Sequence, residues 1–150
     1  MTGDYPALPS IEVITQYITA LRARDDATMQ RLRSPDFLLD WVHNDAVANL
    51  PGTHEVADQF WSVWFSAFPE MDYEATRTIA AKDVVVVQWV FTGTQAGPLG
   101  PPVFDPPLEQ IGKTMRLRGI SVYDIQAGLI TRETMYIDLA TLWVELGVTP

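Results

Sequence analysis

Cysteine is absent from this chain of 150 residues, so its chemistry must come from carboxylates, tyrosines, hydroxyls, arginines and two histidines. Without a thiol there is no disulfide, no thiolate nucleophile and no cysteine-ligated zinc or iron-sulfur cluster. His43 ends a predicted strand and is expected near the mouth of a pocket, where an imidazole could exchange protons at neutral pH. It is therefore a candidate acid/base group, with a purely structural histidine as the alternative.

Two further motifs resemble functional sites but lack the residues that such sites need. The run HEVAD, from His54 to Asp58, is similar to a zinc-binding helix, but Asp58 replaces the second histidine and no third ligand is evident. Acidic residues near a helix start are explained better by the helix dipole. The glycines of GTQAGPLG precede prolines among which no helix can start, so they form no phosphate cradle. The sequence predicts neither a metal nor a cofactor.

The first half of the chain must position these side chains with three helices and one strand. Ser10 can cap a first helix with apolar residues at helical spacing, a short second helix covers 27–33, and Thr53 caps a third. Pro35 ends the second helix, because the residue before a proline is pushed out of helical geometry. The run FLLDWVH, residues 37–43, is rich in strand formers.

The second half has the pattern of strands. Turn signals separate four candidates, YEATRTIAA, VVVVQWVFTG, TMRLRGISVYDI and LITRETMYID, and a short helix over 139–146 follows them. The last two strands meet in a turn at 126–128. The Gly- and Pro-rich segment 93–113 is long for a passive connection and is expected to act as a pocket lid. Helices followed by antiparallel strands predict a single α+β domain, with the helices on one face of a curved sheet.

Composition and charge limit the partners of the chain. Hydrophobic residues make up 47% of it and charged residues 19%, which is typical of a folded domain. The net charge of -9 repels nucleic acid and anionic lipid, so neither a nucleic acid nor a membrane is expected as a partner. The N-terminus lacks the pattern of a signal peptide, and no apolar run approaches the roughly 20 residues that span a bilayer. The expected location is the cytoplasm.

The segment from Phe68 to Val148 resembles the SnoaL-like polyketide cyclases. The similar runs are AFPEMDYEA, VVVQWVFTGTQAG, GKTMRLRGISVYDIQAGLITRE and YIDLATLWVELGV, and the first half of the chain fits more loosely through YITALRARDD and SPDFLLD. The resemblance implies the cone-shaped fold of nuclear transport factor two. In this fold three N-terminal helices pack on the concave face of a curved antiparallel sheet, a short C-terminal helix follows, and the pocket is the cone interior. Members include enzymes and proteins that only bind, so the fold does not fix the function.

The resemblance directs attention to three positions. Asp138 lies where the last strand turns into the final helix, at a place where SnoaL-like proteins carry a carboxylate, and capping that helix is the alternative. Asp40 lies near the general-base aspartate of ketosteroid isomerases, although an ungapped match falls on Trp41. Strand side chains alternate between faces, so only one of the two points inward. Tyr17 matches the phenol that donates to the substrate oxygen in ketosteroid isomerases, with a core tyrosine as the alternative.

The chain also departs from these relatives. Limonene-type epoxide hydrolases use an Asp-Arg-Asp relay, but Gln88 and Val90 occupy its first two positions here. Gln95 stands where many SnoaL-like chains have a histidine, and an amide can hydrogen-bond a carbonyl but cannot carry a proton. Trp41 and Trp89 are the tryptophans best placed to contact a flat apolar ligand, because both lie on predicted strands.

Together these features predict a cofactor-independent lyase or isomerase that acts on an apolar, carbonyl-bearing small molecule by cyclisation, isomerisation or elimination. The predicted catalytic residues are Asp138, Asp40, Tyr17 and His43, and the predicted substrate-binding residues are Trp41, Gln88, Trp89, Gln95 and Tyr136. A second hypothesis is a non-catalytic domain that binds an apolar metabolite or dimerises, and a water-activating hydrolase ranks below both. The broad apolar face of the third helix also predicts a homodimer.

Overall fold

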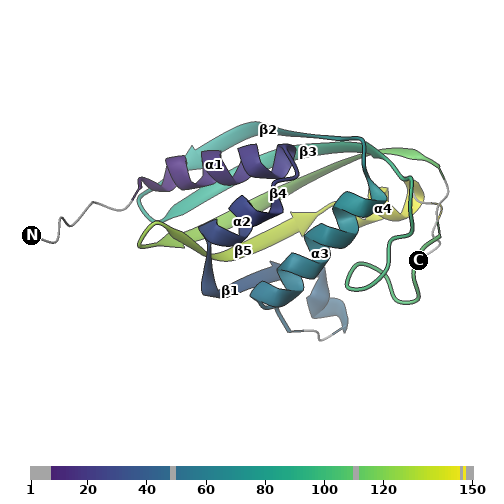
Figure 1. The fold of residues 1–150 in the computed structure, drawn as a ribbon, viewed down its shortest axis with the longest axis horizontal. Coiled ribbons are helices and arrows are strands. Elements are labelled where there is room, and N and C mark those ends of the chain that lie inside the picture. Colours follow the sequence, from purple (N-terminus) through teal and green to yellow (C-terminus); the bar gives the residue numbers. More distant parts are fainter. Residues whose placement is uncertain (1–7, 48–49, 110–111, 146, 148–150) are drawn as a thin grey trace, which may run out of the picture.

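The computed structural model describes residues 8–47, 50–109, 112–145 and 147, and they form an α+β fold (Figure 1). The helices are α1 (Ser10–Arg22), α2 (Asp26–Leu32), α3 (His54–Ala67), α4 (Leu139–Glu145) and the 3-10 helix η1 (Val42–Val47). The strands are β1 (Arg33–Trp41), β2 (Met71–Ala80), β3 (Val84–Thr94), β4 (Thr114–Gln126) and β5 (Leu129–Ile137). Leu146, predicted to end the last helix, lies outside the described residues.

The strands form one curved, open sheet in the order β1-β5-β4-β3-β2. Pairing is antiparallel from β2 to β5, as predicted, but β1 runs parallel to β5. The prediction of a fully antiparallel sheet is therefore wrong at this edge. No hairpin joins β1 to β5, and the chain between them passes through α3 and three strands, so either direction was open to it. Figure 1 shows α1, α2 and α3 together on one face of the sheet, as the cone fold requires.

Local sequence explains where the helices begin. Asp25 caps α2 and Thr53 caps α3, each by accepting a hydrogen bond from the backbone amide three residues on. The predicted cap of α1 is wrong, because Pro9 holds the N-cap position and Ser10 is already helical. The Ser10 hydroxyl instead donates to the carbonyl of Ala81 at 2.6 Å, which ties the start of α1 to the turn between β2 and β3.

The boundaries of β1 differ from the prediction, whereas the turn between β4 and β5 agrees with it. β1 begins at Arg33 and ends at Trp41, so it includes Pro35, which is tolerated because β1 is an edge strand. His43 consequently lies beyond the strand, in η1. The predicted turn between β4 and β5 is confirmed: Ala127 and Gly128 both have positive φ, of 51° and 77°, as a tight hairpin turn requires.

The core fills the space between the helices and the inner face of the sheet. α3 buries Phe60, Trp61 and Trp64 there, and Trp64 packs against Phe91 of β3 with ring centroids 5.1 Å apart. The apolar face of α3 is thus covered inside the chain, so it no longer argues for a partner, and the homodimer stays a prediction. Within the described part of the chain, no helix has the length and apolar character to cross a membrane.

Candidate functional site

A carboxyl group is buried on the inner face of the sheet. Glu133 on β5 is only 1% exposed and lines a cavity of about 30 Å³, whose other walls are apolar and aromatic side chains from α3 and from β2 to β5. Its Oε2 atom accepts a hydrogen bond from the Ser121 hydroxyl at 2.8 Å. Its Oε1 atom has no hydrogen-bond partner among the described residues. This oxygen is therefore available to a ligand that enters the cavity.

The surroundings of Glu133 make it a proton-exchanging group near neutral pH. Burial is the largest influence and raises the pKa of Glu133 from 4.5 to about 7, against the opposing effects of the Ser121 hydroxyl, the Arg33 charge and the Tyr123 hydroxyl. Acid and carboxylate forms are then similarly populated at pH 7. Such a carboxyl can serve as a general base or a general acid.

Three buried tyrosines surround this carboxyl. Burial raises the pKa of Tyr17, Tyr73 and Tyr123 well above the ordinary value of 10, so each stays a neutral hydroxyl at physiological pH. The Tyr17 hydroxyl and the indole N–H of Trp61 have no hydrogen-bond acceptor among the described residues, and the N–H lies close enough to the phenol oxygen to lower the pKa of Tyr17. Both are hydrogen-bond donors, and Trp61 is one of the residues that line the interior cavity. Tyr17, predicted from the resemblance, therefore lies inside the cone.

A buried cation lies near the same group. The Arg33 side chain is fully buried at the start of β1, where its Nη2 atom is 2.8 Å from a carboxylate oxygen of Asp58. Its charge lowers the pKa of both Glu133 and Tyr17. His54 lies beside the same ion pair, since its Nε2 atom is 3.6 Å from a carboxylate oxygen of Asp58 and its Nδ1 atom is 2.9 Å from the Ser34 carbonyl oxygen. Among the described residues, no three His, Asp or Glu side chains lie close enough together to hold a metal ion.

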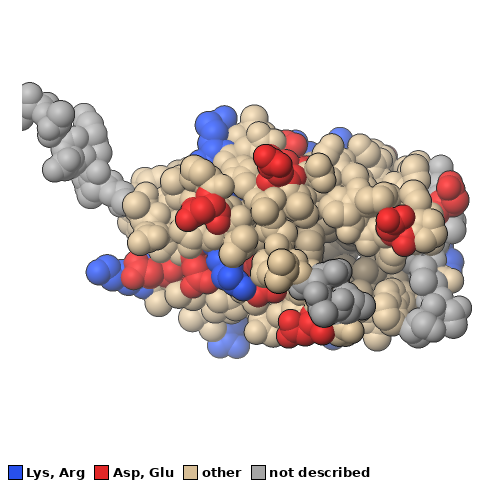
Figure 2. All heavy atoms as spheres, turned by 90° about the horizontal axis from the view of Figure 1, so that it is seen from below, with Lys and Arg blue, Asp and Glu red and all other residues tan. Residues whose placement is uncertain are grey.

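A wider cavity, which we call the mouth, adjoins the interior one. It has a volume of about 550 Å³, and it shares Phe60, Trp64 and Ile137 with the interior cavity. None of the described residues that line it is Asp, Glu, Lys or Arg. Figure 2 shows acidic side chains scattered over one face of the molecule, with wide uncharged areas between them and a hollow in its right half. The mouth therefore suits a neutral, apolar molecule despite the net charge of -9.

His43 lines this mouth, as predicted, although it does so from η1. Its Nδ1 atom is buried and has no hydrogen-bond partner among the described residues. Burial lowers the pKa of His43 below its ordinary value of 6.5, so the imidazole is neutral at pH 7. A neutral imidazole can both donate and accept a hydrogen bond, which suits it to orient a polar group at the entrance.

The Gly- and Pro-rich segment borders the mouth, and the buried side chain of Gln95 forms hydrogen bonds within it. Val103 and Phe104 of this segment line the mouth. Gln95 is fully buried, and its amide nitrogen donates to the carbonyls of Gly97 and Glu109 at 3.1 Å each. The prediction that Gln95 binds substrate is therefore wrong, because its amide holds the two ends of the segment together. The role of the segment as a lid stays a prediction.

Asp138 does not face the interior. It is exposed, and its two carboxylate oxygens accept hydrogen bonds from the amide and the hydroxyl of Thr141, at 3.1 and 2.6 Å. These bonds hold the pKa of Asp138 below its ordinary value. Asp138 therefore caps the final helix, the alternative given for it, and its predicted place on the floor or rim of the interior pocket is wrong, because it borders the depression on the outer face instead.

The register of β1 places Trp41 inside and Asp40 outside. Trp41 lines the mouth and packs against Phe60 with ring centroids 5.2 Å apart. Asp40 points to the opposite face, where Arg132 donates to its carboxylate at 2.6 Å. The prediction of Asp40 as a desolvated general base is therefore wrong, and Trp41 is the one of the two residues that faces inward.

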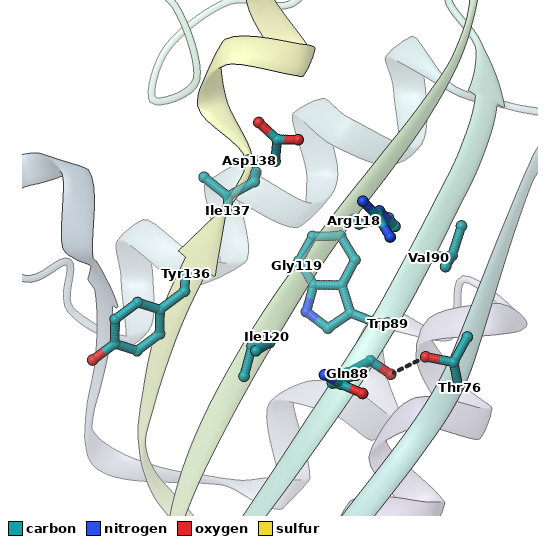
Figure 3. A pocket seen from close by; sticks show the side chains of 10 residues that line it. All are labelled: Thr76, Gln88, Trp89, Val90, Arg118, Gly119, Ile120, Tyr136, Ile137 and Asp138. Atoms are coloured by element: carbon teal, nitrogen blue, oxygen red, sulfur yellow. Dashed lines mark hydrogen bonds between the residues drawn. The ribbon is translucent and has the colours of Figure 1, made fainter.

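The remaining predicted residues divide between the two faces. Trp89 lies inside, on the wall of the interior cavity. Gln88, Tyr136 and Asp138 meet Arg118 in a depression of about 440 Å³ on the outer face of the sheet (Figure 3). The predictions that Gln88 and Tyr136 bind substrate inside the cone are wrong, because strand alternation turns both side chains outward.

Glu133 is the residue that the sequence prediction missed. Counting back from the inward Ile137 by twos gives Met135 and then Glu133, so a signal was present. Counting forward from the buried Ile130 places Glu133 on the wrong face, because the pairing of β4 with β5 shifts register beside Thr131. The signal was a carboxylate at 133 on the same face of the strand as the apolar residues at 135 and 137.

Comparison with known proteins places the chain among SnoaL-like structures. The family model described as SnoaL-like domain matches residues 14–133. AclR, a candidate hydroxylase from Streptomyces galilaeus, has a TM-score of 0.77 at 16% identity over 93% of this chain and 96% of its own. A candidate SnoaL-like polyketide cyclase from Jannaschia sp. CCS1 has a TM-score of 0.74 at 17% identity over 99% and 100%. TerC, co-crystallised with polyporic acid, has a TM-score of 0.69 at 18% identity over 93% of this chain and 99% of its own. No curated protein sequence matches the chain.

Proposed function

Since this chain belongs to the SnoaL-like domain family, we propose that its cone interior is an active site for acid/base chemistry on a neutral, apolar, carbonyl-bearing small molecule. The observation that carries the proposal is Glu133, a carboxyl with a free oxygen and a pKa raised to about 7 at the inner end of an uncharged aromatic cavity. Burial of a carboxyl is costly, and perturbed carboxyls concentrate at functional sites.

The sizes of the two cavities suggest how such a molecule would bind. The mouth, at about 550 Å³, has room for a ring system, whereas the interior cavity, at about 30 Å³, has room for a group of about the size of a water molecule. A flat ligand would therefore keep its rings in the mouth, against Trp41 and Phe104, and extend an oxygen-bearing end toward Glu133. TerC, whose fold is similar, was co-crystallised with polyporic acid.

The proposed chemistry is proton transfer at the carbon next to the carbonyl. The carboxylate of Glu133 takes the proton, and the negative charge moves to the carbonyl oxygen. The Tyr17 hydroxyl and the Trp61 N–H, both without acceptors among the described residues, donate to that oxygen and stabilise its charge. Glu133 then returns the proton to the same or another carbon. Isomerisation, elimination and ring closure can all begin with this step.

His43 has a separate role in this proposal. It lies at the mouth and is neutral at pH 7, so it can bind a second polar group of the ligand without carrying the reactive proton. Glu133, Tyr17 and His43 would then replace the set of Asp138, Asp40, Tyr17 and His43 that the sequence suggested.

A domain that only sequesters an apolar metabolite is the competing proposal. It needs no inward carboxyl, and an uncharged residue in place of Glu133 would bind such a metabolite at no desolvation cost. The raised pKa of Glu133 favours catalysis over sequestration for this reason. Hydrolysis by an activated water has less support, since Gln88, which replaces a member of the epoxide hydrolase relay, lies on the outer face.

Exchange of carbon-bound protons tests the proposed function without knowledge of the natural substrate. The probe is 2-tetralone, a neutral bicyclic ketone, incubated with the protein in D2O and followed by proton NMR. We expect the protein to accelerate loss of the signals next to the carbonyl over the buffer rate, because exchange requires only the proton transfer itself. A panel of larger fused-ring ketones extends the assay, and a panel that exchanges at the buffer rate throughout contradicts the proposal.

A further inference from the structure

A line of hydrogen bonds crosses the sheet to reach Glu133. The indole Nε1 of Trp89 on β3 donates to the Ser121 hydroxyl on β4 at 3.0 Å. That hydroxyl donates in turn to Oε2 of Glu133 on β5 at 2.8 Å. Trp89 is 5% exposed, Ser121 is fully buried and Glu133 is 1% exposed, so water does not compete for these bonds.

The directions of both bonds follow from the chemistry of the groups. An indole N–H is a donor only, so Trp89 must give its proton to the Ser121 oxygen. Ser121 has a single proton of its own, and the bond from Trp89 already uses one of its two lone pairs. The proton of Ser121 therefore points to Oε2 of Glu133, which must accept it.

This arrangement treats the two oxygens of Glu133 differently. A proton on Oε2 would have to be donated to Ser121, so the 2.8 Å bond would be reversed and the Ser121 proton would have to turn from Glu133 toward the Tyr123 hydroxyl beside it, at a cost in free energy. A proton on Oε1 leaves both bonds intact. Oε1 is also the oxygen without a hydrogen-bond partner among the described residues. The acid form of Glu133 thus carries its proton on Oε1.

The backbone of β4 is shaped to hold Trp89 in this position. Gly119 is paired directly with Trp89, and Ser121 lies two residues farther along the same strand. A Cβ atom at position 119 would lie 2.2 Å from Cζ2 of Trp89, a distance that no side chain tolerates. Figure 3 shows the indole ring lying beside Gly119. The missing side chain lets the indole lie flat on β4 and brings its N–H to Ser121.

We propose that Ser121, oriented by Trp89 over Gly119, is a positioning residue that assigns the reactive proton of Glu133 to Oε1. The position of the proton on Oε1 follows from hydrogen-bond geometry, and only its part in catalysis rests on the proposed function. The other groups around Glu133 are Arg33 from β1, Tyr17 from α1, Tyr73 from β2 and Tyr123, which lies opposite it on β4. Tyr73 stacks on Trp89 with ring centroids 5.6 Å apart, so Trp89→Phe, which keeps a ring at this position, is the variant chosen.

The test is a titration of Glu133 by NMR on protein labelled with carbon-13 at the Glu carboxyl, with no substrate present. Ser121→Ala removes the donor to the carboxylate form, and we expect the pKa of Glu133 to rise by about one pH unit. Trp89→Phe frees the Ser121 hydroxyl to rotate, so we expect a smaller rise. In the double variant we expect a rise close to that of Ser121→Ala alone, because the hydrogen bond of Trp89 reaches Glu133 through Ser121 and the Phe ring still covers the cavity wall.

Two further variants and a second signal complete the design. Ser121→Thr keeps a hydroxyl and should keep the pKa near that of the native protein, and Thr134→Val, next to Glu133 but on the opposite face of β5, is the matched control. In Ser121→Ala the indole N–H resonance of Trp89 should move upfield, which reads the first bond even if Trp89→Phe folds poorly. Additive shifts, or no shift in Ser121→Ala, would overturn the proposal. If the native protein does not accelerate ketone exchange but the expected pKa changes of the variants are observed, only the proposed function is overturned.

Discussion

Glu133→Gln is expected to lower the rate of 2-tetralone exchange by roughly two to four orders of magnitude, because a side-chain amide cannot accept the proton that a carboxylate takes. The substitution preserves the shape of the side chain and leaves an oxygen that can still accept the bond from Ser121. The fold should therefore persist, and the far-ultraviolet circular dichroism should match that of the native protein. Exchange rates at pH 7, measured by proton NMR in D2O, give the comparison.

Asp138→Asn provides the matched comparison, since it changes another acid to its amide at the position that the family resemblance favours. Asp138 is exposed and bonds to Thr141, outside the interior cavity, so we expect this variant to exchange 2-tetralone at nearly the native rate. If instead Asp138→Asn were inactive and Glu133→Gln active, the assignment of the acid/base group would be reversed.

The stability of the native protein is expected to fall as pH rises from about 4.5 to above 7, through the titration of Glu133. Its pKa is about 7 in the folded chain, against an ordinary 4.5, so the folded state holds the proton over a range in which the unfolded state has lost it. Protons bound more tightly by the folded state stabilise it at low pH, and that stabilisation is lost as pH rises through the folded pKa. The difference corresponds to roughly 3 kcal/mol.

Urea denaturation at pH 5 and pH 8, on native protein and on Glu133→Gln, measures this effect. The variant cannot ionise at this position, so we expect it to be the more stable protein at pH 8. His43 acts with the opposite sign, because its lowered pKa makes stability fall as pH decreases. His43 titrates in both proteins, so its effect on stability is the same in each and cancels in the comparison. Equal responses of native protein and variant to pH would show that folding does not raise the pKa of Glu133.

Most of the fold could be predicted from the sequence because its signals are local. Thr53 caps α3, the 126–128 turn joins β4 to β5, and helices come before strands, as the pattern indicated. Two of the misplaced features depend on tertiary contacts. Ser10 bonds to Ala81, far away in the sequence, and β1 takes a parallel place beside β5 that no local signal encodes. Each is decided only after the sheet has assembled.

The candidate site was harder to predict, because it depends on which face each strand side chain occupies. A register error of one residue separates Trp41 from Asp40, and a shift near Thr131 hides Glu133. Tyr17 lies inside the cone and His43 lines the mouth, as predicted, although His43 does so from η1 and not from the end of β1. The resemblance located the pocket region but pointed to Asp138, whose local hydrogen bonds with Thr141 hold it outside.

A crystal structure with 2-naphthol bound would test the central claim most directly, because this aromatic hydroxyl has the shape of the enol of 2-tetralone. Our account predicts that its rings lie in the uncharged mouth, that its oxygen accepts hydrogen bonds from the Tyr17 hydroxyl and the Trp61 N–H, and that the ring carbon next to that oxygen faces Oε1 of Glu133. The outer depression near Asp138 and Arg118 has a comparable volume, about 440 Å³, and offers the competing site. Naphthol bound in that depression, with the interior cavity unchanged, would contradict the account.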